Sequence, residues 1–575
     1  MKPVRHLLFA SLALGAVAAV CAPGCDLVVD ASSDSCESDA DCVNRANTVC
    51  DSEQHVCVSL DTCQVNADCP SDQICRHFSP RACVSLKTPV PTQPADESST
   101  EANCQIVYPD DPAVWRDDST ILIGVTAPRS YQDGEDLVPS IDSITNGAIL
   151  AVDELNDKGG LNNQNKLALV ICDDYGTDNF AENNGRALAA MGVQSIVGAA
   201  YSSQTIAMAA GTSGQPGTVA NGQLTISSGA TSPDVTGIED HAPACVTTCG
   251  SDTTCADACP GLVWRTSPSD QIQGDAINAY FKDLEPIVKN RTGTEQAEIK
   301  VTILHRDDSY GKNLADFVAK GLEFNGKKAN LQTDLFHVRN YGSAATPAQS
   351  VIDAAIADQP DVLMLLCTFD ELAGVVPQIE AQWLGASETL PYYVLADGGL
   401  NDTMVGDLFS VGAQGRTRGV IPGTDNDLFK NFGAAYLMRF PDKSVDGTFD
   451  TFGAAGAYDS IYLMAYSAIA AKDAPLTGEQ LASGLSLLSD VANGQVIEAG
   501  PLAFGQASND LRNGQTLNFE GASGPLDFDL QTGEAPSDIN VWCIDGTGAT
   551  QSSGRHYDAK TGKMAGAVDS GACPF

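Results

Sequence analysis

From about residue 119 onward, short continuous apolar runs alternate with longer segments whose apolar residues recur at helical spacing. The run TILIGVTA at 120–127 is followed by SITNGAILAVDELNDKGG at 143–160, which has one apolar helical face and ends on two glycines. Continuous apolar runs are typical of parallel strands that are buried on both faces, and intervening helices cover those faces. The alternation predicts an α/β fold built on doubly wound parallel sheets.

The alternation occurs in two series, which predicts two lobes. The first series contains further strand-like runs at 166–174, 193–200 and 224–230, and the second contains runs at 299–309, 331–338, 360–369 and 390–399. Helix-like segments separate them. The length of 575 residues also exceeds the ~250–300 residues that a single compact core supports.

The net charge restricts the possible partners. The chain carries 74 acidic and 32 basic residues, a formal net charge of −42. Nucleic acids and anionic lipid headgroups are bound by Lys and Arg, which replace their counterions, so an acidic surface repels them. The sequence therefore predicts no nucleic-acid partner.

The first 24 residues have the pattern of a secretory signal. Lys2 and Arg5 precede an apolar run at residues 7–20, which is shorter than the ~20 residues of a membrane-spanning helix. The run closes on APGC, which resembles a bacterial lipobox. We expect Cys25 to be the lipidated mature N-terminus, the only membrane attachment of an exported cell-envelope protein that faces the periplasm or the surface. The alternative is a secreted protein with Cys25 in a disulfide.

Export makes the nineteen cysteines candidates for disulfides. Residues 25–87 contain two similar units, CESDADCVNRANTVCDSEQHVC and CQVNADCPSDQICRHFSPRAC, which predict a duplicated module stapled by disulfides. The candidate cysteines of the two units are Cys36, Cys42, Cys50, Cys57, Cys63, Cys69, Cys75 and Cys83. Asp39, Asp41 and Asp68 lack the rest of a calcium loop, so we interpret them as solvated turn residues. Residues 88–118, most of whose first half belongs to the stretch KTPVPTQPADESSTEA at 87–102, are predicted to be a semi-rigid linker.

A second cysteine cluster has the sequence CVTTCGSDTTCADAC. Its cysteines are paired at a spacing of four, which places each pair on one helical face and predicts two short helices joined by two disulfides. These cysteines are Cys245, Cys249, Cys255 and Cys259. Zinc binding by four thiolates is the alternative. The number of cysteines outside the signal and lipid positions is odd, and the apolar setting of Cys367 makes it a candidate for the unpaired thiol.

Several spaced motifs resemble one family. The stretches are GAILAVDELNDKGGLNNQNKLALVICDD, IVGAAYSS, SSGATSPDVT, RDDSYGKNLADFVAKGL and NFEGASGPLDFD. From about Thr120 to the C-terminus, they resemble the leucine/isoleucine/valine-binding branch of the type I periplasmic binding proteins. The resemblance implies two Rossmann-like lobes joined by three crossovers, with a small ligand closed between them.

The resemblance also suggests where the lobes begin and end within 119–575. We place the crossovers near VWRTSPSD at 263–270, near ADGGLND at 396–402 and before GPLDFD at 524–529. The first lobe would then comprise about 119–265 and 402–500, and the second about 266–401 and 501–575.

Two small polar loops follow strand-like runs of the first series and form the expected binding site. Ligands of open α/β sheets sit beyond the carboxyl ends of the strands, where backbone N–H groups and helix N-termini favour negative charge. Ser202, Gly229 and Thr231 suit a carboxylate, and by resemblance they would hold the α-carboxylate of an amino acid. The Gly229 carbonyl and the Thr231 hydroxyl would also reach its α-amino group. Each residue alone is compatible with ordinary helix capping or turn chemistry.

The second lobe is expected to supply the counter-charge. Asp397 matches the acidic residue that family members place against the α-amino group, and Tyr310 matches a tyrosine that lines the cleft. Thr368 stands where the family often has an aromatic residue, which opens or polarises the pocket. We therefore expect an amino acid or a similar solute without specifying leucine. Arg129 could meet an acidic ligand side chain, with a surface role as the alternative.

Three classes of function compete, two of binding protein and one of enzyme. The first is a lipid-anchored receptor that captures a small zwitterionic solute and delivers it to an ABC permease. The second is a sensor or cell-envelope interaction protein without transport, which the cysteine modules favour. We find no G-x-S-x-G elbow, H-E-x-x-H helix or Walker loop, and the seven histidines are scattered, so we expect no catalysis, cofactor or metal.

Overall fold

The chain forms two compact units, Met1–Thr62 with Ser79–Arg81 and Cys63–Phe78 with Ala82–Phe575. The computed structural model describes residues 48–51, 56–59 and 62–567, except for 79, 134–135, 140–141, 162–164, 212–213, 292–297, 343–346, 368–374, 384–389, 401, 424–425, 442–452 and 473–475. In the first unit, β1 (Thr48–Asp51) and β2 (Val56–Ser59) form an antiparallel hairpin in which Cys50 lies opposite Cys57.

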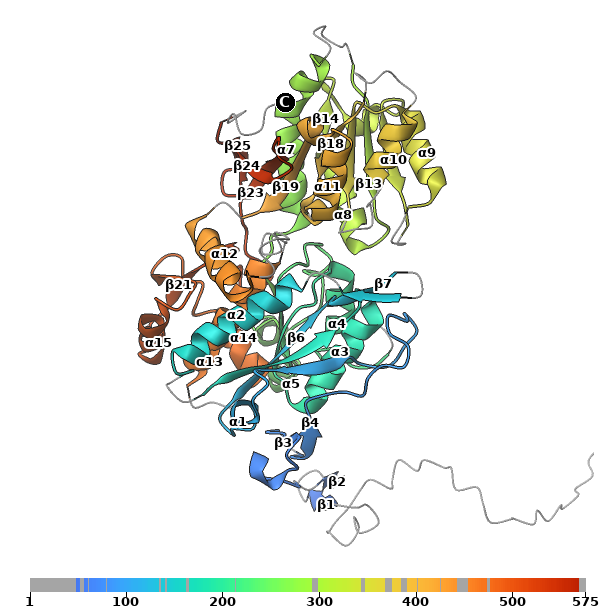
Figure 1. Cartoon of the computed structure of the whole chain (residues 1–575). Coiled ribbons are helices and arrows are strands. Elements are labelled where there is room, and N and C mark those ends of the chain that lie inside the picture. The colour runs from blue at the N-terminus through green and yellow to red at the C-terminus, as the bar shows by residue number, and fades with distance from the viewer. Residues whose placement is uncertain are drawn as a thin grey trace, which may run out of the picture. The chain divides into compact units, whose positions relative to one another are not determined.

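The larger unit contains a six-stranded sheet that defines lobe 1 (Figure 1). From edge to edge its strands are β12 (Val263–Arg265), β11 (Leu224–Ser227), β10 (Ser195–Val197), β6 (Ile121–Ala127), β9 (Leu167–Asp173) and β5 (Cys104–Tyr108). All neighbours are parallel except β5, which is antiparallel to β9. The first series of apolar runs therefore forms a parallel sheet, as predicted.

Helices from two separate parts of the chain cover this sheet. The first part supplies α1 (Pro112–Trp115), α2 (Ser143–Asp157), α3 (Asp178–Met191) and α4 (Ser202–Ala210), with a hairpin of β7 (Ser130–Asp133) and β8 (Asp136–Pro139). The later part supplies α12 (Asp427–Arg439), α13 (Ala454–Ala471), α14 (Gly478–Leu485), α15 (Phe504–Arg512) and a small sheet of β20 (Gln495–Glu498), β21 (Leu517–Gly521) and β22 (Gly524–Pro525).

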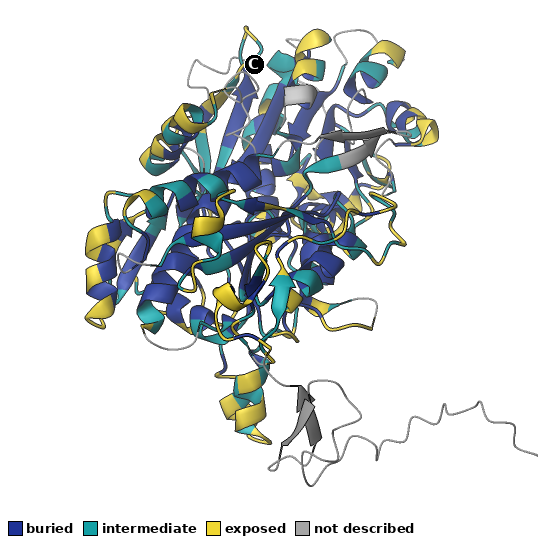
Figure 2. Ribbon diagram, turned by 60° about the horizontal axis from the view of Figure 1, so that its bottom comes forward, coloured by how far each residue is buried: buried dark blue, intermediate teal, exposed yellow. Residues whose placement is uncertain are grey.

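The strand β9 shows why continuous apolar runs form buried strands. Leu167, Leu169 and Ile171 pack on the face covered by α2 and α13, while Val170 and Cys172 pack on the opposite face. Since both faces of the strand are covered, every residue of β9 is buried. Figure 2 shows that buried residues are concentrated in the interior of the larger unit.

Lobe 2 contains an eight-stranded mixed sheet. In sheet order its strands are β16 (Phe336–Asn340), β13 (Val301–His305), β17 (Val362–Leu366), β18 (Tyr392–Leu395), β19 (Thr417–Pro422), β23 (Ile539–Ile544), β24 (Thr550–Asp558) and β25 (Lys563–Ala565). The first five are parallel, and β23 to β25 continue antiparallel. The main helices are α7 (Asp270–Lys289), α8 (Ser309–Gly321), α9 (Gln349–Asp358), α10 (Val375–Gln382) and α11 (Asp402–Ser410). The remaining short elements of this lobe are β14 (Glu323–Phe324), β15 (Lys327–Lys328), η3 (Ala329–Leu331), η6 (Asp397–Gly399) and η7 (Gln414–Arg416).

The crossovers differ in part from the expected positions. The first follows β12 and reaches α7 at Asp270, where we placed it. The second lies at 422–427 and not at 396–402, because α11 and β19 still belong to the sheet of lobe 2. The third lies at 535–539, after GPLDFD, because Phe519, Leu526 and Phe528 pack in the core of lobe 1. The expected lobe boundaries at 401 and 500 are therefore wrong.

The segment 88–118 is not simply a linker. Residues 104–108 form β5, which pairs with β9, and a disulfide joins Cys104 to Cys172 across these two strands. The segment thus completes the edge of the lobe 1 sheet, and the prediction of a linker over its whole length is wrong.

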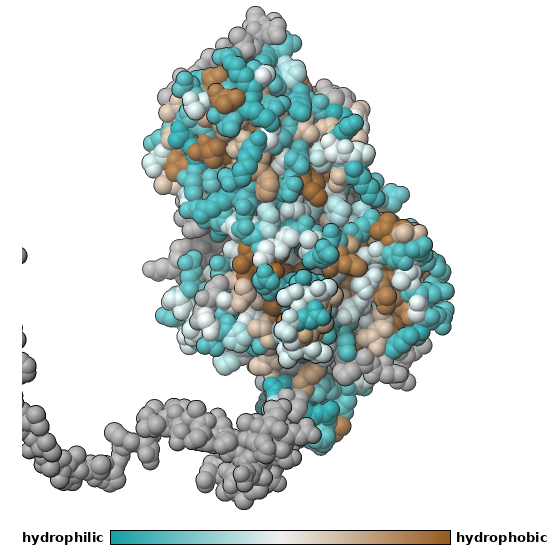
Figure 3. Space-filling view, turned by 180° about the vertical axis from the view of Figure 1, so that it is seen from behind, coloured by the Kyte–Doolittle hydropathy of each residue, from teal (hydrophilic) through white to brown (hydrophobic). Residues whose placement is uncertain are grey.

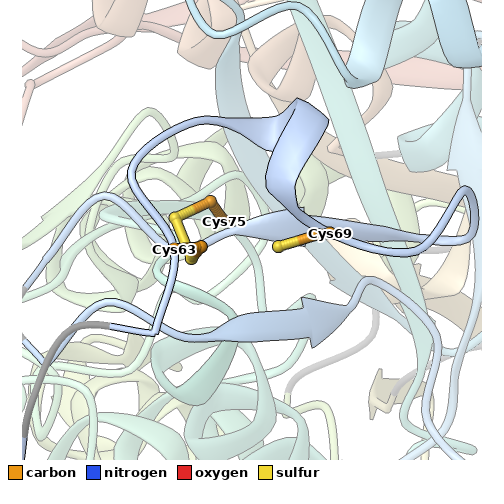
Figure 4. Close-up of side chains that lie close together, drawn as sticks. All are labelled: Cys63, Cys69 and Cys75. Atoms are coloured by element: carbon orange, nitrogen blue, oxygen red, sulfur yellow. A yellow bond between two sulfur atoms is a disulfide. The ribbon is translucent and has the colours of Figure 1, made fainter.

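The second cysteine module, residues 63–85, contains two crossed disulfides, Cys63–Cys75 and Cys69–Cys83. Figure 4 shows Cys63 and Cys75 joined beside Cys69. The module contains η2 (Asn66–Asp68), β3 (Gln73–Cys75) and β4 (Cys83–Ser85). Asp68 accepts the backbone N–H groups of Gln64 and Val65, so it is a turn residue, as interpreted.

The module is fixed to lobe 1 through Arg116. Its guanidinium donates to the carbonyls of Asn66 at 2.7 Å and Cys69 at 3.2 Å, and also to those of Pro70 and Gln73. One partly buried guanidinium therefore binds four carbonyls of a segment that has almost no apolar core of its own.

The cysteine cluster at 245–259 forms the stapled hairpin that the sequence predicted. The helices α5 (Pro243–Cys249) and α6 (Thr253–Ala256) are joined by the disulfides Cys245–Cys259 and Cys249–Cys255, which leaves no thiolates for zinc. Cys367 is a free, buried thiol, as expected.

Other sequence predictions lie outside the described residues. They concern the signal at 1–24, Cys25, Cys36, Cys42 and the side chains of Cys50 and Cys57. Across the part of the chain that the structure describes, we find no helix with the length and apolar character needed to cross a membrane. One face of the molecule is dominated by hydrophilic side chains with smaller apolar areas between them (Figure 3).

Candidate ligand-binding site

Two loops of lobe 1 come together beyond the carboxyl ends of β10 and β11. Ser202 is the first residue of α4, and its Oγ accepts the backbone N–H groups of Thr231 at 3.2 Å and Ser232 at 3.1 Å. The cap of α4 is Tyr201, so the Ser202 side chain links the two loops and does not cap its own helix. Three predicted residues, Ser202, Gly229 and Thr231, thus lie in one small region.

Gly229 allows these loops to approach closely. A Cβ atom at this position would lie 2.6 Å from the carbonyl oxygen of Ala200, which is too close for any side chain. The Thr231 side chain is buried, and its hydroxyl lacks a hydrogen-bond partner of good geometry. The lobe 1 face of the site therefore consists of closely packed loops and a Thr231 hydroxyl without a partner of good geometry.

Asp397 and Tyr310 of lobe 2 contact each other directly. Asp397 begins η6 immediately after β18, and Tyr310 lies in the first turn of α8. The Tyr310 hydroxyl donates to Asp397 Oδ1 at 2.6 Å, and both side chains are buried. Burial raises the pKa of the Asp397 carboxyl above its usual range, although the Tyr310 hydrogen bond opposes the shift. The two lobe 2 residues singled out from the sequence thus contact each other, a contact that the sequence did not predict.

A second acid, Asp270, joins this site and was not identified from the sequence. It is the first residue of α7, its backbone N–H donates to the Thr231 carbonyl at 2.8 Å, and its side chain is 0% exposed. Both carboxyl oxygens lack a hydrogen-bond partner of good geometry. Burial, followed by the nearby charge of Asp397, raises the pKa of Asp270 well above its usual range.

Further buried polar groups without good partners lie in the loops after β11 and β12 and at the starts of α7 and α8. They are the hydroxyls of Ser228, Thr266 and Ser309 and the side-chain amide of Gln273. Buried polar atoms are normally hydrogen-bonded, because leaving one unpaired costs ~1–3 kcal/mol. Such exceptions on the loops and helix starts that carry the candidate residues favour a site that is completed by a polar ligand.

The two lobes contact each other at the edge of this region. Asn313 of α8 donates to Ser232 Oγ at 3.0 Å and to Asp234 Oδ2 at 2.8 Å. The Ser232 hydroxyl also donates to the carbonyl of Ser309 at 3.1 Å. The loop that follows β11 therefore connects the lobe 1 residues to the start of α8.

Two further candidates were named from the sequence, Arg129 and Thr368. Arg129 forms an ion pair with Asp142 at 2.7 Å, so its charge is already compensated. Thr368 lies outside the described residues.

Comparisons with known proteins agree with this architecture. The sequence profile of the periplasmic binding protein family matches residues 120–549. A Leu/Ile/Val-binding protein homolog 1 of Brucella abortus (strain 2308) is 28% identical over 226 residues, or 38% of this chain. That match spans 47% of the relative, about half the length of the curated relatives that the chain resembles.

Solved structures share the fold at low sequence identity. The branched-chain amino acid transporter substrate-binding protein LivJ of Streptococcus pneumoniae, in complex with isoleucine, is 18% identical, has a TM-score of 0.50 and covers 75% of this chain and 99% of its own. A type 1 periplasmic binding protein of Bordetella pertussis Tohama I is 15% identical, with a TM-score of 0.52 and the same coverages. The chain belongs to the periplasmic binding protein family and has the fold of its type I members.

Proposed function

We propose that this protein is an extracytoplasmic receptor that binds an amino acid or a similar small zwitterion between its two lobes and delivers it to an ABC permease. The observation that carries the proposal is the buried carboxyl of Asp270, which has no partner of good geometry and lies beside Asp397. A buried acid pair of this kind needs a cation, and the hydroxyls and backbone groups nearby suit an anion.

The proposed pose uses both faces of the site. The ligand carboxylate lies against Ser202, Gly229 and Thr231 at the N-terminus of α4, where the helix dipole stabilises negative charge. The ligand ammonium lies between Asp270 and Asp397, and Tyr310 holds the Asp397 carboxyl in place. The Thr231 carbonyl accepts the backbone N–H of Asp270, so the positions of the carboxylate and the ammonium are adjacent. An amino acid carries both groups on one α-carbon and therefore needs adjacent positions.

The names of the related proteins favour a branched-chain amino acid, since one is a Leu/Ile/Val-binding homolog and another holds isoleucine. The proposal covers amino acids generally, because Thr368 is a polar residue where the sequence comparison led us to expect an aromatic one. We also propose membrane attachment through a lipid on Cys25.

A second candidate function is a cell-envelope interaction protein that uses the same fold without transport. The specific observation in its favour is the pair of stapled additions, the module at 63–85 and the hairpin at 243–259. Neither contributes a residue to the described binding site.

Thermal unfolding of the mature chain against a panel of the twenty amino acids tests the proposal. A ligand present at a hundred times its Kd adds ~2.7 kcal/mol to the stability and raises Tm. We expect the shift to disappear in Asp397→Asn, which keeps the shape and the Tyr310 contact but removes the charge. The matched control is Asp283→Asn, which loses only an ion pair with Arg555. If no amino acid raises the Tm, this result would contradict the receptor function and favour the second candidate.

A further inference from the structure

The acid pair of the site is unusual because it lacks compensating positive charge. Asp270 is 0% exposed and Asp397 is 2% exposed. Asp397 accepts a hydrogen bond from Tyr310, and the side-chain amide of Gln273 lies beside it. The Thr231 hydroxyl lies beside Asp270, but neither carboxyl oxygen of Asp270 has a hydrogen bond of good geometry. An ionised carboxylate that is buried without a partner costs several kcal/mol, and two such charges near each other cost more.

The surrounding groups do not supply a free cation among the described residues. The titratable or charged groups that influence the pair are Arg265 of β12, Asp308 and Tyr310 at the start of α8, and Cys367 after β17. Asp308 is an acid, and Tyr310 and Cys367 are neutral hydroxyl and thiol groups. The single cation of this set is Arg265.

The guanidinium of Arg265 contacts groups other than the two acids. Its guanidinium donates to the Ser232 carbonyl at 2.8 Å and to Thr236 Oγ1 at 3.0 Å, and it forms an ion pair with Glu534. Asp308 is itself paired with Arg306 at 2.9 Å. Since neither arginine hydrogen-bonds to Asp270 or Asp397, the pair has to be neutralised in another way.

We propose that the ligand-free site holds one proton on the Asp270–Asp397 pair, and that an entering ammonium group displaces this proton into solvent. The inference rests on the proposed function. In the exchange, a carboxylic acid and a ligand ammonium become a carboxylate–ammonium contact and one released proton, so that charge and atoms balance. The site thereby distinguishes ligands that carry an ammonium from neutral or purely anionic solutes, which leave the proton in place.

The direction of the pH dependence follows from this exchange. Burial and the charge of Asp397 raise the pKa of Asp270 in the ligand-free protein, and a bound ammonium lowers it. At any pH between the two values, binding releases a proton. The affinity therefore rises with pH, up to tenfold per pH unit, until it passes the pKa of the ligand-free pair.

The first test needs no ligand. We would record the infrared carbonyl band of protonated carboxylic acids in the ligand-free full-length mature protein at pH 7, and compare wild type with Asp270→Asn and Asp397→Asn. We expect a band that is lost or shifted in both variants and unchanged in Glu154→Gln. Glu154 serves as the control because it is a partly buried acid outside the site, and its carboxyl accepts hydrogen bonds from the hydroxyls of Tyr458 and Tyr462. Spectra of wild type and Asp270→Asn with identical acid bands would overturn the inference.

The second test counts the protons. We would titrate the protein with each of the twenty L-amino acids by calorimetry in phosphate and in Tris at pH 7, because the two buffers differ in ionisation enthalpy. We expect release of about one proton per bound amino acid in wild type and in Glu154→Gln. In Asp270→Asn, we expect weaker binding without proton release.

The outcomes separate the two proposals. Binding by wild type with no buffer dependence overturns the proton displacement but leaves the receptor function intact. Absence of binding by all twenty amino acids overturns the receptor function and, with it, the displacement. Proton release that persists undiminished in Asp270→Asn would also refute the assignment of the proton to this pair.

Discussion

Removing the Cys104–Cys172 disulfide should destabilise lobe 1 far more than lobe 2. The bond joins the edge strand β5 to β9 and closes a loop with a sequence separation of 68 residues. In the chain-entropy description, a cross-link over a loop of this length destabilises the unfolded state by about 4.4 kcal/mol at 25 °C. Because every 1.4 kcal/mol is a factor of ten, the double variant Cys104→Ala/Cys172→Ala should increase the unfolded fraction of lobe 1 about a thousandfold.

Hydrogen–deuterium exchange followed by mass spectrometry measures this effect strand by strand. We expect the amides of β9 and β6 to lose protection, and those of β13 and β17 in lobe 2 to keep it, because the lobes have separate cores. The matched control is Cys367→Ala, which removes one buried sulfur without breaking a cross-link and should cost about 1 kcal/mol. Unchanged protection of β9, or an equal loss in both lobes, would refute the reasoning.

Three further predictions follow from individual contacts. Gly229→Ala should weaken amino acid binding by about 1–3 kcal/mol in calorimetry, because its Cβ would meet a backbone carbonyl, whereas Gly415→Ala, which has no neighbour within 4 Å, should not. Burial raises the pKa of Asp174 from 3.8 to about 8, so the folded state keeps a proton that the unfolded state loses in this range. Asp174 should therefore lower the free energy of unfolding as the pH rises from 3.8 to about 8. Over that pH range, the urea midpoint of Asp174→Asn should fall less than the midpoint of the wild type. Arg116→Met should increase proteolysis of the segment 63–85 while leaving ligand-induced Tm shifts unchanged, and a loss of those shifts would link the module to binding.

The strands of both lobes were predictable because burial on two faces requires continuous apolar sequence. β9, β13 and β17 are buried along their whole length, and each lies within one of the apolar runs of the sequence. β5 was missed for the opposite reason. It is a short edge strand with a mixed pattern of exposure, and its partner lies far along the chain, so no local signal distinguishes CQIVY from the linker before it.

The second and third crossovers could not be located from local sequence. The stretch TRGVIP at 417–422 is a strand like any other, and only its pairing with β18 and β23 assigns it to lobe 2. The small sheet with β21 similarly belongs to lobe 1 through its packing. Lobe membership is a property of long-range contacts, and periodicity does not encode it.

Residues of the candidate site could be predicted from the sequence where a loop follows a recognisable strand. Ser202, Gly229, Thr231 and Asp397 all occupy such positions, and the structure brings the first three together and pairs the last with a tyrosine. Asp270 was overlooked because the sequence SPSD is an ordinary helix start, with Ser269 as the cap. Its importance arises from complete burial and missing partners, which only the three-dimensional arrangement reveals.

The most direct test of the account is a crystal structure of the mature chain with the amino acid that gives the largest thermal shift. We expect density between the lobes, with the ligand ammonium within hydrogen-bond distance of both Asp270 and Asp397 and the carboxylate at Ser202 and Thr231. A ligand bound elsewhere, or in the reverse orientation with its carboxylate against the two acids, would contradict it.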